Sequence, residues 1–583
     1  MVKTCLIPIF ILFGLFFSFC GGPQDGTYSF EILSTNDLHG TFFDSTYVGK
    51  RIKKSLYAVK WTVDSVRTVA GREHVILMDG GDILQGDNAA YYFNYVDTLS
   101  PHVFPRMAAY LSYDAVTVGN HDIETGHSVY DRVAKELNAE GIPFLAGNAF
   151  RTDNGKTYFP GWKLIKRKGI RILVLGYTNP NVKNWLAENL WSGMTFKSLL
   201  PLVQQDVDRL RARLKPHLVI VSVHSGTGEG DGKSLENQGM DLYRTLRGVD
   251  FLFCAHDHQP VVFCSDTLCL INAGSHCRFV GHGTIGLTFR RGEVLERRLK
   301  AGLISVDDAR IDTAMAAKFH ADYRAVKTFT TTPVGELKTE LRTRDAYAGM
   351  CDYINLIHSL SLSCAPARLS IAAPLTYDGT VKPGTVLYND LFTIYPFENQ
   401  LYVIEMTGSE VKRYLEISYE DWIRTYPNPE GRILKIEPYT NRMTGRKGWS
   451  FVNRSYNFDS AGGLVYTVDV TKPFGERVRI ASLAGGKPFS AEATYPVAMT
   501  SYRASGGGGL LKKAGVDTDK IEERVLVAYP EIRDLLYDYI KARGAIDHRE
   551  IGDTAKIGHW SFEPASIAEP ALEKDLKLLF GDY

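Results

Sequence analysis

Five short clusters rich in histidine, aspartate and asparagine stand out in the first half of the chain. They are Asp37-Leu-His39-Gly40, Gly80-Gly81-Asp82, Gly119-Asn120-His121-Asp122, His224-Ser-Gly226 and His256-Asp-His258. Histidine combined with carboxylate favours zinc, manganese, cobalt or iron over calcium and magnesium, which prefer shells made only of oxygen. Asp82 stands in a glycine loop, and its two carboxylate oxygens suit a bridge between ions about 3.5–4 Å apart. The clusters therefore predict two divalent transition-metal ions.

Each cluster taken alone has an ordinary explanation. Asp-x-His is common in surface loops, Gly-Asp in turns, and Asn-His-Asp is also typical of a helix cap. The joint pattern carries the prediction, because every cluster directly follows an apolar run that resembles a strand. Alternate residues of an extended segment point to the same side. Asp37 and His39 are therefore expected to face together, as are His256 and His258.

The apolar runs belong to a regular alternation of strands and helices. Strands are expected at residues 28–34, 74–78, 115–118, 170–175, 218–223 and 251–254, and helices between them at 56–69 and 199–214. Strands separated by helices indicate an α/β layered domain. In open α/β sheets, ligands bind at the carboxyl ends of the strands. We therefore expect the five clusters to meet at one sheet edge, although they are far apart in the sequence.

The chain length predicts more than one domain. Its 583 residues exceed the roughly 250–300 residues at which a single hydrophobic core stops growing. The predicted segments are a signal peptide at 1–20, a catalytic domain at 27–303, a bridging helix at 304–330, a second domain at 331–556 and a C-terminal tail at 557–583. Ile311, Met315, Phe319 and Tyr323 give the bridging segment its helical spacing.

The first twenty residues predict export. Residues 6–19 are almost wholly apolar, and a run of about 15 is short for a membrane-spanning helix but normal for a signal peptide. Cys20 at its end indicates a bacterial lipoprotein, although Phe19 stands where a small residue is usual. Simple secretion with cleavage after Cys20 and an uncleaved anchor are the alternatives. The expected location is the periplasm, or the outer membrane or cell surface as a lipoprotein.

The net charge of the chain limits which molecules it can bind. The formal net charge of +1 provides no basic field for a nucleic-acid backbone, so no nucleic-acid duplex is expected as a partner. A small anionic substrate would then need a local positive site, such as metal ions.

Export permits disulfides. Cys264 and Cys269 flank a turn between two strand-like runs, and they either close a disulfide across a hairpin or remain buried thiols.

The five clusters resemble the motifs D-x-H-G, G-G-D, G-N-H-D, H-S-G and H-D-H of the calcineurin-like metallophosphoesterases, within their 5'-nucleotidase branch. The resemblance extends over nearly the whole mature chain. It implies an α/β fold, α+β overall, with an N-terminal four-layer αββα sandwich, a bridging helix and a C-terminal α/β nucleoside-binding domain. It also implies two ligand sets. One is Asp37, His39, Asp82 and His258, and the other is Asp82, Asn120, His224 and His256.

The resemblance further implies a role for His121. The matching histidine of the family stabilises the phosphoryl transition state or protonates the leaving oxygen, and a residue three positions later orients it. Glu124 stands there, where 5'-nucleotidases usually carry Asp; a solvated acid at a helix start is the alternative interpretation. In another departure, Ala255 precedes His256 where the family usually has glycine.

Two loops of the second domain are rich in aromatic residues. They are residues 390–401 and 500–509. Proteins stack bases on aromatic side chains, which contributes about 1–3 kcal/mol per base. By resemblance, Phe397 and Tyr502 match the two positions of the family's base clamp, and Asn399 matches the contact to the base edge. The alternative is that such aromatics are core residues.

Two departures in this domain bear on the substrate. Residues 370–379 read SIAAPLTYDG, without the arginine of the family's Asn-Gly-Gly-x-Arg stretch, and Gly508 replaces the family's ribose-binding aspartate. Together with Tyr456-Asn-Phe-Asp459, these features are similar to the 2',3'-cyclic-nucleotide 2'-phosphodiesterase/3'-nucleotidase subgroup. We therefore expect an exported dinuclear-metal phosphoesterase that hydrolyses such nucleotides to nucleosides and phosphate.

Other functions fit the same scaffold. A 5'-nucleotidase or a UDP-sugar pyrophosphatase would use the same metal site, and a surface nucleotide-binding protein without catalysis would share the fold. The presence of every expected ligand disfavours the last of these. The sequence leaves the oligomeric state, the base preference and the native metals undetermined.

Overall fold

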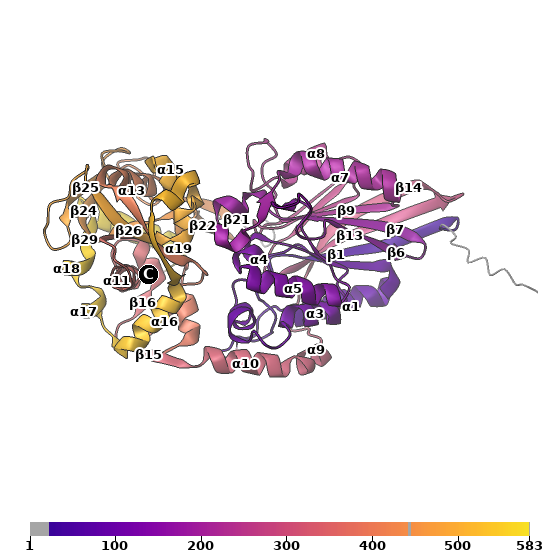
Figure 1. Ribbon diagram of the computed structural model, residues 1–583, viewed down its shortest axis with the longest axis horizontal. Helices are drawn as coiled ribbons and strands as arrows, with labels where there is room; N and C mark the ends of the chain where they lie inside the picture. Colours follow the sequence, from indigo (N-terminus) through magenta and orange to yellow (C-terminus); the bar gives the residue numbers. More distant parts are fainter. Residues whose placement is uncertain (1–22, 50, 441–444, 582–583) are drawn as a thin grey trace, which may run out of the picture.

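The computed structural model describes residues 23–49, 51–440 and 445–581, so the leader with Cys20 lies outside the described residues. Figure 1 shows two lobes side by side, joined along one side by α9 (Thr313–Lys318) and α10 (His320–Thr330). Among the described residues, no helix is both long enough and apolar enough to cross a membrane.

The N-terminal lobe contains two six-stranded sheets. The first has the order β14 (Glu293–Ser305), β13 (Phe279–Arg290), β1 (Gly26–Thr35), β2 (Val75–Asp79), β3 (Ala115–Thr117), β4 (Phe144–Leu145). The second has the order β11 (Pro260–Cys264), β12 (Cys269–Ala273), β10 (Phe251–Cys254), β9 (Leu218–Val223), β7 (Ile170–Tyr177), β6 (Trp162–Arg167).

Side-chain alternation along the strands explains how the layers stack. Ile32 packs between the two sheets with Ile172, whereas its neighbour Leu33 packs on the helix side. The first sheet is covered by α1 (Leu56–Ala70), α3 (Val103–Leu111) and α5 (His127–Ala139), and the second by α7 (Leu199–Leu214) and α8 (Gly239–Thr245). Strands buried on both faces are expected to be continuously apolar, as β9 is. The predicted four-layer αββα sandwich is confirmed.

Most strands next to the clusters run parallel. In the first sheet β1, β2, β3 and β4 are parallel neighbours, and in the second β7, β9, β10 and β12 are. Their carboxyl ends lie at the edge that faces the other lobe (Figure 1). We call this edge, with the loops that follow these strands, the metal edge.

The C-terminal lobe is built on a five-stranded sheet. Its order is β23 (Ser460–Gly462), β17 (Leu369–Ala372), β26 (Thr494–Thr500), β20 (Gln400–Thr407), β27 (Val525–Glu531). Around it lie α11 (Asp352–Cys364), α12 (Tyr388–Ile394), α13 (Gly408–Trp422), α14 (Ser501–Ala504), α15 (Leu510–Ala514) and α16 (Ile532–Arg543). Two smaller sheets are β25 (Val478–Leu483), β24 (Leu464–Asp469), β29 (Gly558–Glu563) and β19 (Gly384–Leu387), β15 (Pro333–Leu337), β28 (Ala545–Ile546). The predicted second α/β domain is thereby observed.

The segment set apart as a tail packs into this lobe. Strand β29 pairs in parallel with β24, and its Trp560 and Phe562 are buried. The following helix α19 (Ala565–Phe580) contributes Leu572 and Leu576 to the same core. Residues 558–580 are therefore part of the lobe and not an appendage.

The connection between the lobes differs from the single predicted helix. Phe319 is fully buried and has a φ of −99° and a ψ of 14°, outside the helical range, so α9 ends there and α10 begins. Next to α10 the lobes meet in an aromatic contact. The ring of Tyr91, from α2 (Asn88–Tyr91), lies 6.2 Å from that of Phe329 and 5.5 Å from that of Phe392. Beside it, the Tyr91 hydroxyl donates to Asp534 and Asn88 donates to Asn389.

The two cysteine alternatives are resolved in favour of pairing. Cys264 and Cys269 form a disulfide that closes the β11–β12 hairpin.

Candidate metal centre

The five sequence clusters meet at the metal edge. Asp37 and His39 follow β1, Asp82 follows β2, Asn120 follows β3, His224 follows β9, and His256 and His258 follow β10. Asp37, His39 and His258 form one group and Asp82, His224 and His256 another, with ligand atoms within 4.8 Å of one another in each. The amide oxygen of Asn120 lies 2.8 Å from His256 Nδ1 and 3.1 Å from His224 Nε2. All seven predicted ligands are thus brought together.

Hydrogen bonds on the outer side of the histidines set which nitrogen faces inward. His224 Nδ1 lies 2.8 Å from the Gly80 carbonyl, and His39 Nδ1 lies 3.0 Å from the Gln85 carbonyl. These nitrogens must donate, so the Nε2 lone pairs point into the site. His256 is reversed, because its Nε2 lies 2.8 Å from Glu236 Oε1 and its Nδ1 faces Asn120. Such outer contacts are typical of metal-binding histidines.

The inward-facing atoms converge closely. His39 Nε2 and His258 Nε2 lie 2.9 Å apart, and the buried Asp82 Oδ2 lies 3.1 Å from His224 Nε2. Imidazole nitrogens and carboxylate oxygens that converge in this way are the donor set of divalent transition metals. Burial also raises the pKa of Asp37 to about 8 and lowers that of His258 to about 3. A divalent ion would stabilise the carboxylate form of Asp37 and use the lone pair of neutral His258.

The backbone around the ligands is strained. Asp37, His39, Asp82, His256 and His258 all have φ values between 46° and 75°, in the left-handed region that non-glycine residues seldom adopt. Such strain gathers at functional sites, where surrounding structure holds it. Here the carboxylate of Asp122 helps to fix the backbone of the loops that carry the ligands. It accepts the backbone N–H groups of Asp82, Ile83, Leu84 and Gly119, at 2.8–3.0 Å.

Gly119 shows how closely the loops approach. A Cβ atom there would lie 2.1 Å from Asp82 Oδ1, so only glycine fits beside that carboxylate. The sequence cluster therefore contains a steric requirement as well as ligands.

His121 and Glu124 form a pair beside the ligands. His121 Nδ1 lies 2.5 Å from Glu124 Oε2, and Glu124 is buried, so it is not a solvated helix-start acid. Burial opposes protonation, but the carboxylates of Asp82 and Glu124 outweigh it and raise the pKa of His121 to about 10. The pair can hold a proton on the imidazole next to the cavity.

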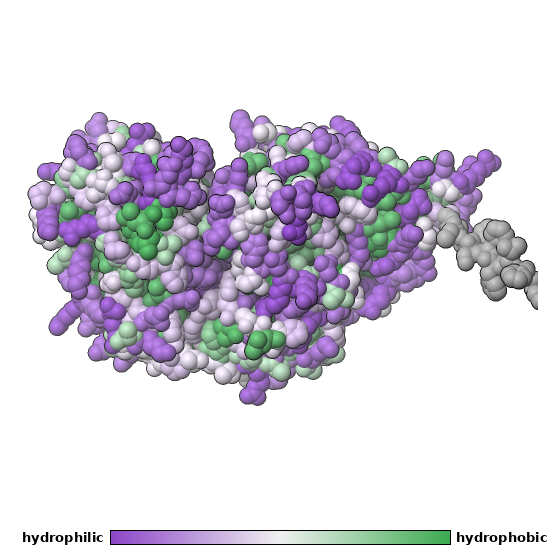
Figure 2. Space-filling model, viewed as in Figure 1, coloured by the Kyte–Doolittle hydropathy of each residue, from purple (hydrophilic) through white to green (hydrophobic). Residues whose placement is uncertain are grey.

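One cavity of about 490 Å³ connects the two lobes, and Figure 2 shows a notch between them on one face. From the N-terminal lobe, Asn120, His121, Glu124 and His256 line it. From the C-terminal lobe, the predicted substrate contacts Phe397, Asn399 and Tyr502 line it. This volume is in the range of small-molecule sites. The structure therefore brings the predicted catalytic and substrate residues to the same space.

Hydrogen bonds from a buried arginine fix the loop that carries Phe397 in the cavity wall. Arg533 is buried and donates to the carbonyls of Tyr395 and Pro396 and to Glu398, which fixes the loop around Phe397. Asn399 follows this loop and points its amide toward the Tyr395 hydroxyl at 3.4 Å.

The glycine run supports Tyr502. A Cβ on Gly507 would lie 2.5 Å from the Tyr502 ring, so the glycine backbone packs directly against that ring. Arg503 holds the run in place, because it donates to the Gly507 carbonyl at 2.8 Å and to the buried carboxylate of Asp459 at 2.7 Å. Arg503 is thus occupied within the protein.

Three residues at the cavity were not predicted. The Trp185 ring stacks on the His256 ring at 5.2 Å and 17°, Glu236 binds the outer nitrogen of His256, and Arg454 is an exposed guanidinium in the lining. Trp185 and Glu236 lie in irregular loops, and no local pattern marks them. Only the aromatic, polar setting of Arg454, beside Tyr456 and Asp459, was visible in the sequence.

Comparisons with known proteins agree with this architecture. The profile "Calcineurin-like phosphoesterase" matches residues 30–260, and the profile "5'-nucleotidase, C-terminal domain" matches residues 328–514. The trifunctional nucleotide phosphoesterase protein YfkN of Bacillus subtilis is 22% identical over 94% of this chain, which spans 40% of YfkN. A 2',3'-cyclic-nucleotide 2'-phosphodiesterase/3'-nucleotidase of Yersinia enterocolitica is 22% identical over 89% of this chain and 86% of its own length.

Solved structures share the fold. A putative 5'-nucleotidase from Staphylococcus aureus, in complex with alpha-ketoglutarate, has a TM-score of 0.75 at 19% identity, and the match covers 92% of this chain and 99% of that one.

Proposed function

Because the chain belongs to the calcineurin-like phosphoesterases with a 5'-nucleotidase C-terminal domain and is a metal-dependent hydrolase of phosphoric esters, we propose that it hydrolyses nucleotides. We propose 2',3'-cyclic nucleotides and 3'-nucleotides as its substrates and nucleosides and phosphate as the final products. The observation that carries this proposal is the shared cavity, with candidate metal ligands at one end and the aromatic pair Phe397 and Tyr502 at the other.

Seven side chains would hold the two ions. Asp37, His39, Asp82 and His258 form one shell and Asp82, Asn120, His224 and His256 the other, with Asp82 common to both. The bound ions would supply Lewis-acid stabilisation of the phosphate and an activated water. The nitrogen-rich set favours zinc, manganese, cobalt or iron.

His121 acts on the leaving group. Its Nδ1 is occupied by Glu124, so Nε2 faces the cavity and delivers the proton that the departing ribose oxygen needs. Glu124 keeps the imidazole charged until then. Its side chain is one carbon longer than the usual aspartate, and the 2.5 Å contact supports the same role for it.

The aromatic wall places the nucleoside. Phe397 and Tyr502 stack the base, and Asn399 contacts its edge. The lining near residues 370–379 is apolar, with Ile371, Ala372 and Ala373. This part of the wall therefore suits an uncharged part of the nucleoside, and the exposed guanidinium of Arg454 supplies a cation elsewhere in the lining.

The location follows from the leader. We propose that the chain is exported and lipidated at Cys20, which would attach it to a membrane. A Cys20→Ser chain should then lose the lipid mass and move to the soluble exported fraction. An unchanged mass would leave simple secretion as the explanation.

Turnover of a substrate panel tests the activity. Metal-stripped enzyme with manganese or zinc restored would be given 2',3'-cyclic AMP, 3'-AMP, 5'-AMP, UDP-glucose and bis-p-nitrophenyl phosphate, with Asp82→Asn as the blank. Turnover of the cyclic and 3' substrates is expected. Turnover confined to 5'-AMP or UDP-glucose would instead identify a 5'-nucleotidase or UDP-sugar pyrophosphatase, and none at all would refute hydrolysis.

A further inference from the structure

The end of the N-terminal sandwich opposite the metal edge carries a group of basic side chains. We call this surface the basic end and define it by Lys166, Lys168, Arg171, Lys215, Arg290 and Arg291. They come from the end of β6, the β6–β7 turn, the start of β7, the loop after α7 and the tip of the β13–β14 hairpin. We propose that the basic end binds the anionic headgroups of a lipid bilayer and so turns the cavity away from the membrane.

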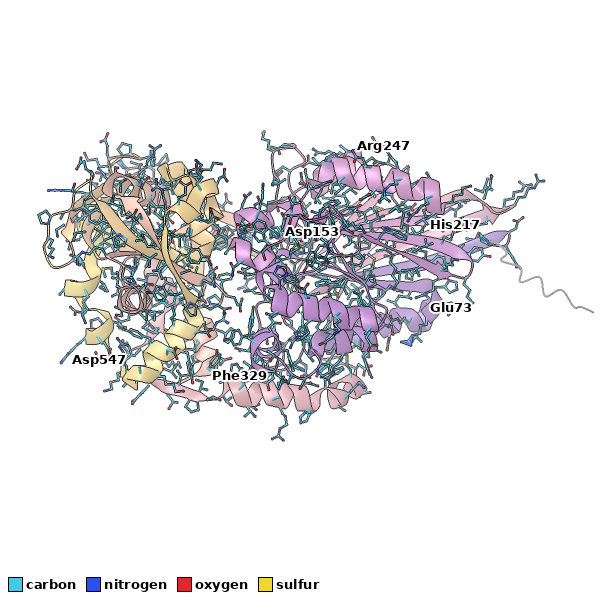
Figure 3. All side chains as sticks on the ribbon, viewed as in Figure 1. Glu73, Asp153, His217, Arg247, Phe329 and Asp547 are labelled. Carbon is cyan, nitrogen blue, oxygen red and sulfur yellow. A yellow bond between two sulfur atoms is a disulfide. The ribbon has the colours of Figure 1, made fainter. Side chains whose placement is uncertain are left out.

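The six residues form one surface. Arg171 donates to the Lys215 carbonyl at 2.6 Å, and the ring of His217 lies 5.1 Å from that of Phe289, the neighbour of Arg290. Lys168 reaches Glu73, which lies in the short helix before β2 of the other sheet, at 2.9 Å. Figure 3 shows Glu73 and His217 at the same end of the sandwich, where the described chain begins.

This surface carries more basic than acidic side chains. Of the nearby acids, Glu73 pairs with Lys168 and Asp250 with Arg297, while Asp25 and Glu293 lie at the hairpin tip. In the part of the chain that the structure describes, Lys166, Arg171, Lys215, Arg290 and Arg291 make no ion pair with an acidic side chain. Because the whole chain has a net charge of only +1, this concentration is a local feature. Clustered cations near a bilayer each contribute about 1 kcal/mol of attraction to anionic lipid.

Three of these residues stand where long side chains are unusual. Lys168, Lys215 and Arg291 have φ values of 49°, 48° and 55°, a region that favours glycine and asparagine. Lys168-Gly169 and Arg291-Gly292 are both two-residue hairpin turns, in which asparagine or glycine usually comes first. Outside the metal edge, this is the largest group of strained non-glycine residues among the described residues. The two tight turns and the C-terminal cap of α7 place these charged side chains at the outermost points of the surface.

The hairpin tip combines charge with an apolar residue. Arg290, Arg291, Glu293 and Leu295 line a hollow of about 390 Å³, and Leu295 is 67% exposed. Figure 2 shows mainly hydrophilic residues projecting at this end of the molecule. Cations at the phosphate level beside one apolar side chain that enters the acyl boundary are typical of membrane-surface contacts.

The position of the chain start favours a bilayer as the partner. Gly26 pairs with Phe289, and Asp25 accepts the N–H of Arg291 at 2.5 Å, so the chain enters β1 beside the hairpin tip. At about 3.5 Å per residue, a lipid on Cys20 would keep Gly26 within about 20 Å of the membrane. Strand β1 then runs roughly 33 Å from Gly26 toward the metal edge. The membrane location rests on the proposed lipidation; the lipid contact itself does not depend on the substrate.

Vesicle binding by the chain that starts at Gly21 tests the proposal. This chain has no lipid anchor but keeps every described element, and turnover of bis-p-nitrophenyl phosphate checks that it is folded. We would measure its sedimentation with vesicles of phosphatidylcholine alone and with 30% phosphatidylglycerol added. Lys168→Glu/Arg290→Glu/Arg291→Glu is the test variant. Lys472→Glu/Arg479→Glu/Lys487→Glu, exposed residues of the C-terminal lobe, is the control with the same charge change.

The expected result is binding to the anionic vesicles only. It should weaken at least about tenfold in the test variant, stay unchanged in the control and disappear in high salt. Turnover should be the same in all three proteins, because these residues lie far from the metal edge. Equal sedimentation with both vesicle types, no sedimentation with either, or equal losses in the two variants would overturn the proposal, whatever substrate the enzyme hydrolyses.

Discussion

The metal edge and the aromatic wall line the same cavity from opposite lobes, and they are built differently. At the metal edge, strained backbone and the four N–H groups bound by Asp122 fix the position of each ligand atom. At the wall, Phe397 and Tyr502 present ring area, and Arg533 and the glycine run support it from behind. One side depends on particular atoms, and the other on shape. Mutations should therefore affect rate at the first and affinity at the second.

The largest effect is expected at Asp82. Asp82→Asn removes a carboxylate shared by both proposed shells, so kcat/KM should fall by on the order of 10³ or more for every substrate. Metal content, measured on the purified protein, should drop by at least one ion per chain. Asp131→Asn, the same chemical change at an exposed helix position, should alter neither. Full metal content with full activity would remove Asp82 from the shells.

His121 should show a dependence on the leaving group. His121→Ala should lower kcat for 3'-AMP by on the order of 10², because a ribose oxygen needs a proton to depart. With bis-p-nitrophenyl phosphate, whose leaving group is stable as an anion, the loss should stay below about tenfold. Glu124→Asp should retain most activity. Equal losses with both substrates would argue for a charge-stabilising role alone.

Substitutions in the aromatic wall should change KM more than kcat. Tyr502→Ala or Phe397→Ala should raise KM for 3'-AMP by about 10–100-fold, the cost of one lost stacking contact of about 1–3 kcal/mol. The turnover of bis-p-nitrophenyl phosphate, which has no base, should change little. Tyr439→Ala, at an exposed tyrosine of the same lobe outside the cavity lining, serves as the control. A loss confined to kcat would contradict a clamp.

The smallest expected effect is on the pH dependence of stability, and it concerns one buried histidine in the interior of each lobe. Burial lowers the pKa of His102 in the first lobe and of His358 in the second to about 3. In the unfolded chain these two histidines bind protons below about pH 6.5, whereas in the folded protein they stay neutral. The free energy of unfolding that they support above pH 6.5 is therefore lost as the pH falls toward 3. From pH 7 to 5.5, each should cost about 1 kcal/mol of unfolding free energy.

Denaturant unfolding at several pH values, with a probe in each lobe, measures this pH dependence of the unfolding free energy. His358→Asn should flatten the pH dependence of the second lobe only, and His102→Asn that of the first. Unchanged slopes would mean that other groups govern acid stability.

The same contrast explains how much of the molecule was predictable. The ligand residues could be assigned because each cluster follows its own strand and metal binding allows few residue types. Glu236 and Trp185 were missed because loops without a pattern place them, and Arg533 because it acts on a segment over 130 residues earlier in the sequence. Strand β29 did leave a signal, since Trp560 and Phe562 alternate with His559 and Ser561. Its partner β24, however, lies almost a hundred residues away.

The contact around Tyr91 has a mechanical consequence. The Tyr91 ring stacks on Phe329 at 15° and meets Phe392 edge-on at 83°, and the Arg533 guanidinium lies over the rings of both Tyr91 and Phe392. The directional links beside them are the hydrogen bonds from Tyr91 to Asp534 and from Asn88 to Asn389, each worth about 1 kcal/mol net. The contact at Tyr91 thus ties the two lobes beside α10 by ring packing, by a guanidinium and by two hydrogen bonds, so a turn of one lobe against the other would have to break directional contacts.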